Sequence, residues 1–176
     1  LEGELGFKFD KKNLLITFHP VTLEKASATT QMQELLMALA KLKNTQLIFT
    51  MPNADTEGRA LINMVVQFAS QHSNAHAFNS LGQLRYLSCL AQVDGVVGNS
   101  SSGLIEVPSF KKGTINIGDR QRGRLQATSV INCEPTQQNI SDAIDILYSP
   151  NFQMDLSWVS NPYGEGGASE KIVKII

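Results

Sequence analysis

The sequence lacks most of the features that mark membrane, secreted or nucleic-acid-binding proteins. No apolar run approaches the roughly 20 residues of a bilayer-spanning helix, and no signal-peptide pattern is present. The two cysteines, Cys89 and Cys133, are too few for a disulfide scaffold and lie in apolar stretches. We therefore expect reduced core thiols in a cytoplasmic protein. The net charge of −1 gives no reason to expect a nucleic-acid or membrane partner.

Patterns of catalytic and metal-binding residues are also scarce. We find no paired carboxylates at helical spacing, no Cys/His pair and no strong Ser/His/Asp signature. Neither the Walker loop nor the G-x-G-x-x-G fingerprint of dinucleotide folds occurs. His72 and His76 have no ligand spacing, so we interpret both as structural or solvated. We expect no metal site and no cofactor.

What the chain does have is a regular alternation of strand and helix patterns over 176 residues, a length typical of one domain. We predict strands at 14–18, 46–51, 75–78, 93–98, 114–117 and 129–133. Helical stripes lie at 32–42, 61–69, 84–91 and 140–147, with a short helix over 103–110 that Pro108 disturbs and a helix cut short at 169–176. This alternation predicts an α/β fold, a Rossmann-like parallel sheet flanked by helices.

Parallel sheets bind ligands at the carboxyl ends of their strands. The polar residues of interest do follow predicted strands: they are His19, Asn53, 79–80, 99–103 and 118–124. We therefore look for a ligand site among these segments.

The strongest local signal is the turn Asn99-Ser100-Ser101-Ser102-Gly103. A serine-rich turn that enters a helix offers backbone N–H groups, hydroxyls and the positive end of the helix dipole to a phosphate. The alternative is a plain helix N-cap, for which serine and asparagine are preferred. A cap needs only one such residue, so four in succession favour an anion site.

A basic loop follows the strand predicted at 114–117. Between positions 111 and 124 the chain carries Lys111, Lys112, Arg120, Arg122 and Arg124 against the single anion Asp119. Arginine matches phosphate geometry, and the flanking glycines of the loop allow close backbone approach. A solvated basic loop is the alternative. Its place after a strand, facing the serine turn, favours phosphate binding.

Weaker candidates remain open. Glu106, one turn into the helix after the serine turn, accepts hydrogen bonds from ribose hydroxyls or is simply favoured by the helix dipole. His19 is a phosphate donor, an acid/base group or a structural residue. Asn53 and Asp55 are ligand contacts or turn residues only. The glycine-rich segment 161–167 either orders on binding or is a flexible linker, and we expect the linker.

Five motifs occur in one order along the chain. They are Thr17-Phe18-His19-Pro20-Val21-Thr22, Met51-Pro52-Asn53-Ala54-Asp55, the run from Gly98 to Val107, Ile117-Gly118-Asp119-Arg120-Gln121-Arg122-Gly123-Arg124, and Asn161-Pro162-Tyr163-Gly164-Glu165-Gly166. Together they resemble the hydrolysing UDP-N-acetylglucosamine 2-epimerases of sialic acid biosynthesis. The Asn-Ser-Ser form of the serine turn is similar to the hydrolysing branch, whereas non-hydrolysing relatives tend to carry Asp-Ser-Gly-Gly.

The resemblance implies a glycosyltransferase-B-like architecture, in which a UDP-sugar lies between two Rossmann-like domains. Residues 1–176 resemble only the C-terminal, UDP-binding domain, and the first residue is Leu1 rather than Met, so we expect a fragment without the N-terminal catalytic domain. In the family reaction UDP is eliminated to give a 2-acetamidoglucal, and water addition yields N-acetylmannosamine. The fragment alone is expected to be inactive, and the full-length parent to be a homo-oligomer.

The resemblance also implies roles for individual residues. Ser100 and Ser101 hold the diphosphate, Arg120 and His19 contact a phosphate, and Glu106 binds the ribose. The remaining UDP contacts are Asn53 and Asp55, which line the cleft, and Phe78, Asn79 and Ser80, which lie beside uracil. Of these, His19, Ser101 and Arg120 are the candidate catalytic residues. Two alternatives remain, the donor domain of a glycosyltransferase and a stand-alone nucleotide-binding module.

Overall fold

The computed structural model describes residues 1–21, 28–52 and 56–175, with the backbone alone for 56–57. In this part of the chain six strands form one sheet, and every neighbouring pair is parallel. The order is β3-β2-β1-β4-β5-β6. The strands are β1 (Lys12–Thr17), β2 (Thr45–Thr50), β3 (Ala75–Phe78), β4 (Gly95–Gly98), β5 (Gly113–Ile117) and β6 (Val130–Cys133). The predicted Rossmann-like parallel sheet is confirmed.

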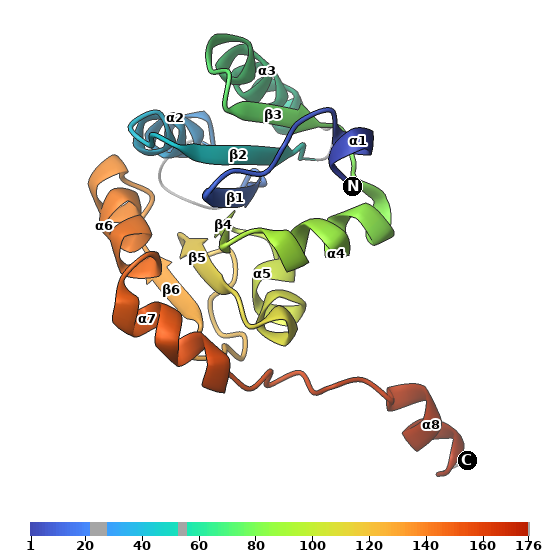
Figure 1. Ribbon diagram of the computed structural model, residues 1–176. Helices are drawn as coiled ribbons and strands as arrows, with labels where there is room; N and C mark the ends of the chain where they lie inside the picture. The colour runs from blue at the N-terminus through green and yellow to red at the C-terminus, as the bar shows by residue number, and fades with distance from the viewer. Residues whose placement is uncertain (22–27, 53–55, 176) are drawn as a thin grey trace.

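Helices connect the strands and cover both faces of the sheet (Figure 1). They are α1 (Glu2–Leu5), α2 (Ala28–Leu39), α3 (Thr56–Gln71), α4 (Gly82–Gln92), α5 (Ser102–Ile105), η1 (Val107–Phe110), α6 (Gln137–Leu147), α7 (Pro150–Asp155), η2 (Leu156–Trp158) and α8 (Ala168–Val173). The sequence patterns predicted all of these except the short α1, α7 and η2, which are too brief to show a periodic stripe.

Two predicted elements differ in detail. The helix expected over 103–110 forms in two pieces, because Pro108 has no N–H and sits in the first turn of η1. The strand expected from Val93 begins only at Gly95, because Val93 ends α4 and its N–H bonds to the Cys89 carbonyl at 2.9 Å. Val93 is nevertheless fully buried, so its apolar character reflects the core and not the strand.

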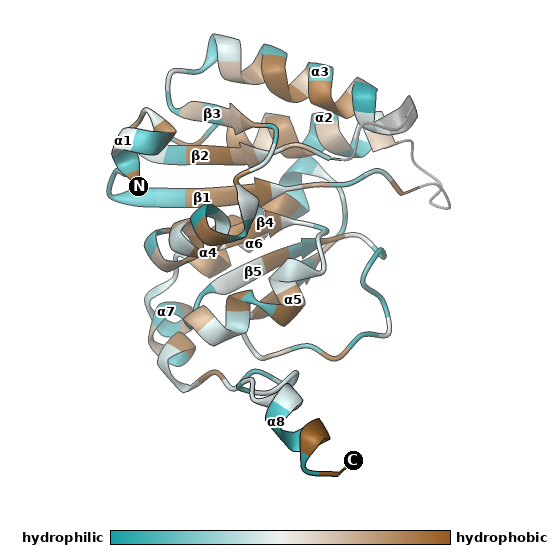
Figure 2. Ribbon diagram, turned by 90° about the vertical axis from the view of Figure 1, so that its right-hand side faces the viewer, coloured by the Kyte–Doolittle hydropathy of each residue, from teal (hydrophilic) through white to brown (hydrophobic). Residues whose placement is uncertain are grey.

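Alternating side chains of β1 divide the core into two layers. Leu14 and Ile16 face the side covered by α2, α3 and α6, whereas Leu15 faces the side of α1 and α4. All three are at most 1% exposed. Burying one such side chain contributes about 1.5–3 kcal/mol, so the sheet is held from both faces. Figure 2 shows apolar residues, coloured brown, in the strands and along the helices that cover them.

The strands β1 and β4 pair at the middle of the sheet, and the order in which strands are added reverses between them. After β1 it builds outward through β2 and β3, and after β4 outward through β5 and β6. Gly98 ends β4 with φ 144°, and a Cβ there would lie 2.0 Å from the Thr17 carbonyl oxygen. Only glycine permits this close approach, which brings the carboxyl ends of β1 and β4 together.

The C-terminal segment leaves the sheet, and α8 lies apart from the rest of the domain in both views (Figures 1 and 2). No helix in the described ranges is long and apolar enough to cross a membrane. Both cysteines are free thiols. Cys89 is a core residue as predicted, but Cys133 is only half-buried because β6 is an edge strand.

Candidate functional site

A hollow of about 350 Å³ opens at the carboxyl ends of β1, β2 and β4. It brings together five of the residues predicted from the sequence, namely His19, Asn79, Ser80, Ser100 and Glu106. The other polar side chains of its lining are Thr17, Thr50, Gln83, Tyr86 and Ser102. The hollow therefore lies at the switch point of the sheet, where folds of this class bind ligands.

Asn99 ties the ends of three strands together at this hollow. Its side chain accepts a hydrogen bond from the His19 N–H at 2.8 Å and donates one to the His19 carbonyl at 2.8 Å. Its own carbonyl oxygen accepts bonds from Arg120 Nη1 at 3.0 Å and Gln121 Nε2 at 2.7 Å. The basic loop after β5 thus meets the serine turn after β4, as the sequence predicted.

The serine turn keeps two backbone donors available. Among the described residues, the N–H groups of Ser100 and Ser101 have no acceptor. Ser101 is the N-cap of α5 without a side-chain capping bond, and the Ser100 hydroxyl instead accepts the Ser102 N–H at 3.4 Å. The helix has only four residues, so its dipole adds less than predicted, and the donors themselves are the main attraction for an anion.

The serine residues that line the hollow differ from the predicted pair, Ser100 and Ser101. Ser100 and Ser102 line the hollow, whereas Ser101 is not among its lining residues. Gly103 is required behind the turn, because a Cβ there would lie 2.6 Å from the Thr114 Cγ2 atom.

Glu106 lies at the end of α5 and not one turn inside a helix. It is the C-cap of α5 and the residue before η1, and it is exposed. Glu106 is at the same time the N-cap of η1, so the dipole alternative applies to that helix and not to α5. Its position in the lining of the hollow keeps ligand binding as the other interpretation.

Tyr86 and Ser102 form a hydroxyl pair that the sequence analysis missed. Tyr86 Oη and Ser102 Oγ are 2.5 Å apart. Burial raises the pKa of Tyr86, and the nearby Glu106 carboxylate adds to the rise while the Ser102 bond opposes it. The pair therefore stays protonated and offers hydroxyl groups, not charge, to the hollow. Tyr86 lies on α4, and the sequence pattern of that helix indicates only its apolar stripe.

The residues expected beside uracil have different surroundings in the structure. Asn79 and Ser80 are exposed at the edge of the hollow, and the Ser80 hydroxyl accepts the Gly82 N–H at 3.1 Å. The Phe78 side chain instead packs into the core layer on the α4 side, with its ring 6.3 Å from that of Phe7. The Phe78 carbonyl accepts the Met51 N–H at 3.0 Å.

Two predicted contacts, Asn53 and Asp55, lie outside the described residues. His72 and His76 lie where a structural role was expected. His72 stacks on Phe68 with ring centroids 3.9 Å apart, and His76 stacks on Phe7 at 4.1 Å. Burial lowers the pKa of His76. No metal-binding cluster of three acidic, histidine or cysteine side chains occurs in the ranges described.

The glycine-rich segment 161–167 is not a free linker at its start. Asn161 donates to the Ile105 carbonyl at 2.8 Å and to the Ser109 hydroxyl at 2.7 Å. The Tyr163 hydroxyl donates to the Leu125 carbonyl at 3.1 Å. These bonds anchor the segment across α5 and the loop after β5, so the linker interpretation is wrong for its first residues.

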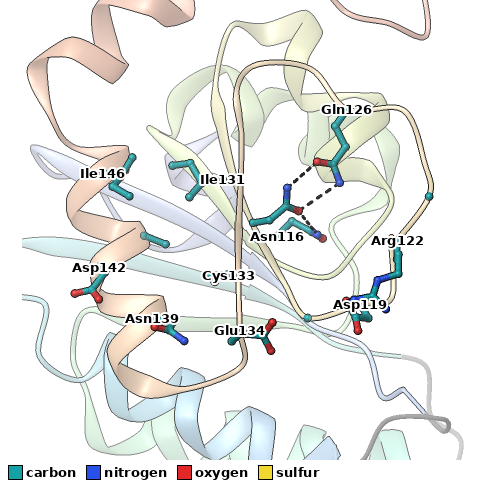
Figure 3. Close-up of a pocket in the computed structure, with 14 residues that line it drawn as sticks. Asn116, Asp119, Arg122, Gln126, Ile131, Cys133, Glu134, Asn139, Asp142 and Ile146 are labelled. Atoms are coloured by element: carbon teal, nitrogen blue, oxygen red, sulfur yellow. Dashed lines mark hydrogen bonds and ion pairs between the residues drawn. The ribbon is translucent and has the colours of Figure 1, made fainter.

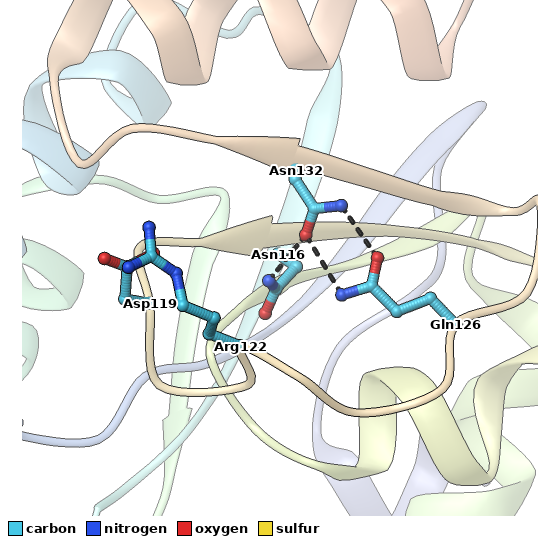
Figure 4. Close-up of polar contacts among 5 residues, drawn as sticks. All are labelled: Asn116, Asp119, Arg122, Gln126 and Asn132. Atoms are coloured by element: carbon cyan, nitrogen blue, oxygen red, sulfur yellow. Dashed lines mark hydrogen bonds and ion pairs between the residues drawn. The ribbon is translucent and has the colours of Figure 1, made fainter.

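A larger groove of about 560 Å³ lies between α6 and the ends of β5 and β6 (Figure 3). Asn116, Asn132 and Gln126 form an amide network on its floor (Figure 4). Its cation Arg122 is paired with Asp119 at 3.1 Å, and the further carboxylates of Glu134 and Asp142 line it. Carboxylates repel phosphate, and three line this groove against one, Glu106, in the hollow, so the hollow between β1 and β4 is the better anion site.

Comparisons with known proteins show the family of the chain. The sequence model of a family described as UDP-N-acetylglucosamine 2-epimerase matches residues 3–176. The chain is 42% identical over 176 residues to the GDP/UDP-N,N′-diacetylbacillosamine 2-epimerase (hydrolyzing) of Campylobacter jejuni, covering 99% of this chain and 45% of that protein. It is 40% identical over 177 residues to the polysialic acid biosynthesis protein P7 of Escherichia coli, with 98% and 45% covered.

Solved structures show the same fold. A crystal structure of UDP-GlcNAc 2-epimerase from Neisseria meningitidis bound to UDP-GlcNAc superposes with a TM-score of 0.73 at 19% identity, covering 98% of this chain and 46% of that one. A sucrose-phosphate synthase from Thermosynechococcus elongatus gives 0.60 at 16% identity, with 88% and 41% covered. The glycosyltransferase-B-like fold class is thereby confirmed. The chain spans about half the length of the curated relatives it matches.

Proposed function

This chain belongs to the UDP-N-acetylglucosamine 2-epimerase family and has hydrolysing relatives, and from this we propose that it is the UDP-binding half of a hydrolysing UDP-sugar 2-epimerase. The proposed reaction converts UDP-N-acetylglucosamine to N-acetylmannosamine and UDP. The chain covers 45% of these relatives, and its motifs resemble the C-terminal domain. We therefore assign it that role and assign the rest of the active site to the part of the relatives that it does not cover.

One observation carries the proposal: Ser100, whose backbone N–H has no acceptor among the described residues, and the Glu106 carboxylate line the same hollow between β1 and β4. The Ser100 and Ser101 N–H groups would hold the diphosphate, supported by His19 and by the guanidinium of Arg120. Glu106, across the hollow, would accept the ribose hydroxyls. Uracil would then lie toward residues 78–80, and Asn53 and Asp55 would be further UDP contacts.

The proposed catalytic contribution of this domain is stabilisation of the leaving group. Negative charge develops on the diphosphate as its bond to the sugar breaks, and fixed donors lower the energy of that charge. His19, Arg120 and the Ser101 N–H would supply it. Glu106 is the one carboxylate among the described lining residues, and it is assigned to ribose. The groups that move protons would therefore come from the other domain.

The sugar is the part of the proposal that the relatives leave open. The Campylobacter jejuni relative and one from Legionella pneumophila, 36% identical over 172 residues and covering 97% of this chain and 44% of that protein, are both named as diacetylbacillosamine 2-epimerases. UDP-N,N′-diacetylbacillosamine is therefore the second candidate substrate. Comparing kcat/KM for the two UDP-sugars in the full-length protein decides between them, and a preference for the diacetamido sugar would replace the first candidate.

The same assay separates the epimerase from a glycosyltransferase, whose donor domain shares this fold. We expect the full-length protein to release UDP and the 2-epimer without any sugar acceptor. Release of UDP only after an acceptor is added would overturn the epimerase assignment. For the chain alone we expect weak UDP binding by calorimetry and no turnover, because half of the cleft is missing. Turnover by the purified chain would show that this half is sufficient.

A further inference from the structure

We infer that Gln121 is a positioning residue that aims the phosphate-binding turn. This inference rests on the proposed function, and it concerns a residue that contacts no part of the hollow itself. Gln121 follows Arg120 in the loop after β5, and its side chain is only 1% exposed. Its Nε2 atom donates to the Asn99 carbonyl oxygen at 2.7 Å.

The Asn99 carbonyl and the Ser100 N–H belong to the same peptide unit. That unit is planar and trans, so its C=O and N–H point in opposite directions. Gln121 holds the oxygen from one side and thereby fixes the direction of the Ser100 N–H on the other. Ser100 lines the hollow, and its N–H has no acceptor in the part of the chain that is described. Gln121 therefore orients a phosphate donor without touching the ligand.

The same bond connects Gln121 to the remaining phosphate groups. Arg120 Nη1 donates to the same oxygen at 3.0 Å, so the two side chains together hold it. The Asn99 side chain bonds to both the N–H and the carbonyl of His19. A shift of Asn99 would consequently move donors on the ends of β1 and β4 and release one contact of Arg120.

Gln121 is held in place at a cost to stability. Its Oε1 atom is buried and has no hydrogen-bond partner among the described residues. A buried polar atom without a partner destabilises the folded state, and an apolar side chain of similar length would remove that penalty. Residues that break such a rule in folded proteins tend to lie at functional sites. The amide of Gln121 fits this pattern because its donor end serves the phosphate turn.

The test compares Gln121→Met with Gln126→Met as a matched control. Both substitutions replace an amide of the same loop with an apolar side chain, but Gln126 is exposed and bonds to Asn132, away from Asn99. Affinities for UDP and for uridine are measured by NMR titration, together with the melting temperature. Uridine lacks the diphosphate, so it reports the site without the phosphate turn.

We expect Gln121→Met to lower the preference for UDP over uridine by about fivefold to tenfold, as for one lost hydrogen bond. Uridine affinity and the melting temperature should stay level or rise. Gln126→Met should leave the preference unchanged. An unchanged preference in Gln121→Met, or a fall in melting temperature with a proportional loss of both ligands, would overturn the inference. Wild-type protein that binds neither ligand would overturn the proposed function and this inference with it.

A second variant covers the case in which Gln121→Met does not fold. Gln121→Glu keeps the length of the side chain but replaces the donor with a carboxyl group. The neutral carboxyl can donate its proton to the Asn99 oxygen, whereas the carboxylate cannot. The preference for UDP, relative to wild type at the same pH, should therefore recover as the pH falls. A preference that does not depend on pH would contradict the positioning role.

Discussion

Asn99 and His19 exchange two hydrogen bonds of 2.8 Å, one through each of the backbone polar groups of His19. The side-chain amide of Asn99 therefore makes the two hydrogen bonds that a neighbouring strand would make. It extends the pairing of β1 with β4 beyond Gly98, the last paired residue of β4. Because Asn99 is only 1% exposed, no water replaces these bonds. The position of His19 at the hollow is thus determined by a residue 80 positions later in the chain.

Asn99→Asp tests this relationship directly. The carboxylate still accepts the His19 N–H, but it faces the His19 carbonyl without a proton to donate. We expect a loss of about 1–3 kcal/mol in the free energy of unfolding, the cost of leaving a buried acceptor unpaired. Chemical denaturation measures it. Asn139→Asp, an exposed amide in the first turn of α6, should change stability little. Equal effects of the two substitutions would contradict the assignment.

Among the cations of the loop after β5, we expect Arg120 to contribute most to UDP affinity. If Arg120 bonds to a phosphate as proposed, Arg120→Ala should weaken UDP binding by about 2–3 kcal/mol, the range for a charge-assisted hydrogen bond. Arg122→Ala is the control, because Arg122 is exposed and paired with Asp119 at 3.1 Å. Calorimetry with UDP compares the two. An affinity unaffected by Arg120→Ala would remove this residue from the site.

The sequence predicted the sheet and the segments that form the hollow, because both follow from local patterns. Apolar strands alternate with helical stripes, and a parallel sheet places the residues after each strand at one edge. His19, Ser100 and Glu106 could therefore be located together without a structure. The grouping of the serine turn with the loop after β5 follows from the same rule.

The residues that support the site could not be found in this way. Tyr86 reaches Ser102 from a helix whose pattern reports only its core face. Gln121 lies between two arginines in a loop whose sequence drew only its cations into the predicted site, whereas its burial depends on the tertiary position of Asn99. The tail was interpreted as flexible because of its glycines, but Asn161 makes two bonds to a segment more than 50 positions earlier. Contacts of this kind have no local sequence signature.

Gly98→Ala should be among the most destabilising single substitutions. A Cβ at this position would lie 2.0 Å from the Thr17 carbonyl oxygen, and φ 144° is itself unfavourable for alanine. We expect a loss of about 4 kcal/mol or more, as for other severe backbone clashes. Gly6→Ala separates the two effects, since Gly6 also has a positive φ of 74° but has no atom near its Cβ position. It should cost only about 1–2 kcal/mol. Similar losses would show that β1 and β4 can separate.

The raised pKa of the Cys133 thiol leads us to expect that the free energy of unfolding depends on pH. Burial, with a smaller contribution from Glu134, raises the pKa of its thiol from 9.0 to about 12. Between these values the folded protein keeps a proton that the unfolded chain has lost, so the free energy of unfolding must fall as the pH rises through this window. The contribution is fully present below pH 9. Because the side chain is half-buried, the slope should be well below the limit of about 1.4 kcal/mol per pH unit.

Cys133→Ser isolates this effect from the other groups that titrate at alkaline pH, because serine carries no ionisable thiol. Denaturation of both proteins should give a constant difference in stability from pH 6 to 8. Above pH 9 the wild-type protein should lose stability faster than the variant, so the difference changes in favour of serine. Curves that remain parallel up to pH 11 would mean that water reaches the thiol in the folded state. The groove between β6 and α6 would then be more open than the packing of Cys133 implies.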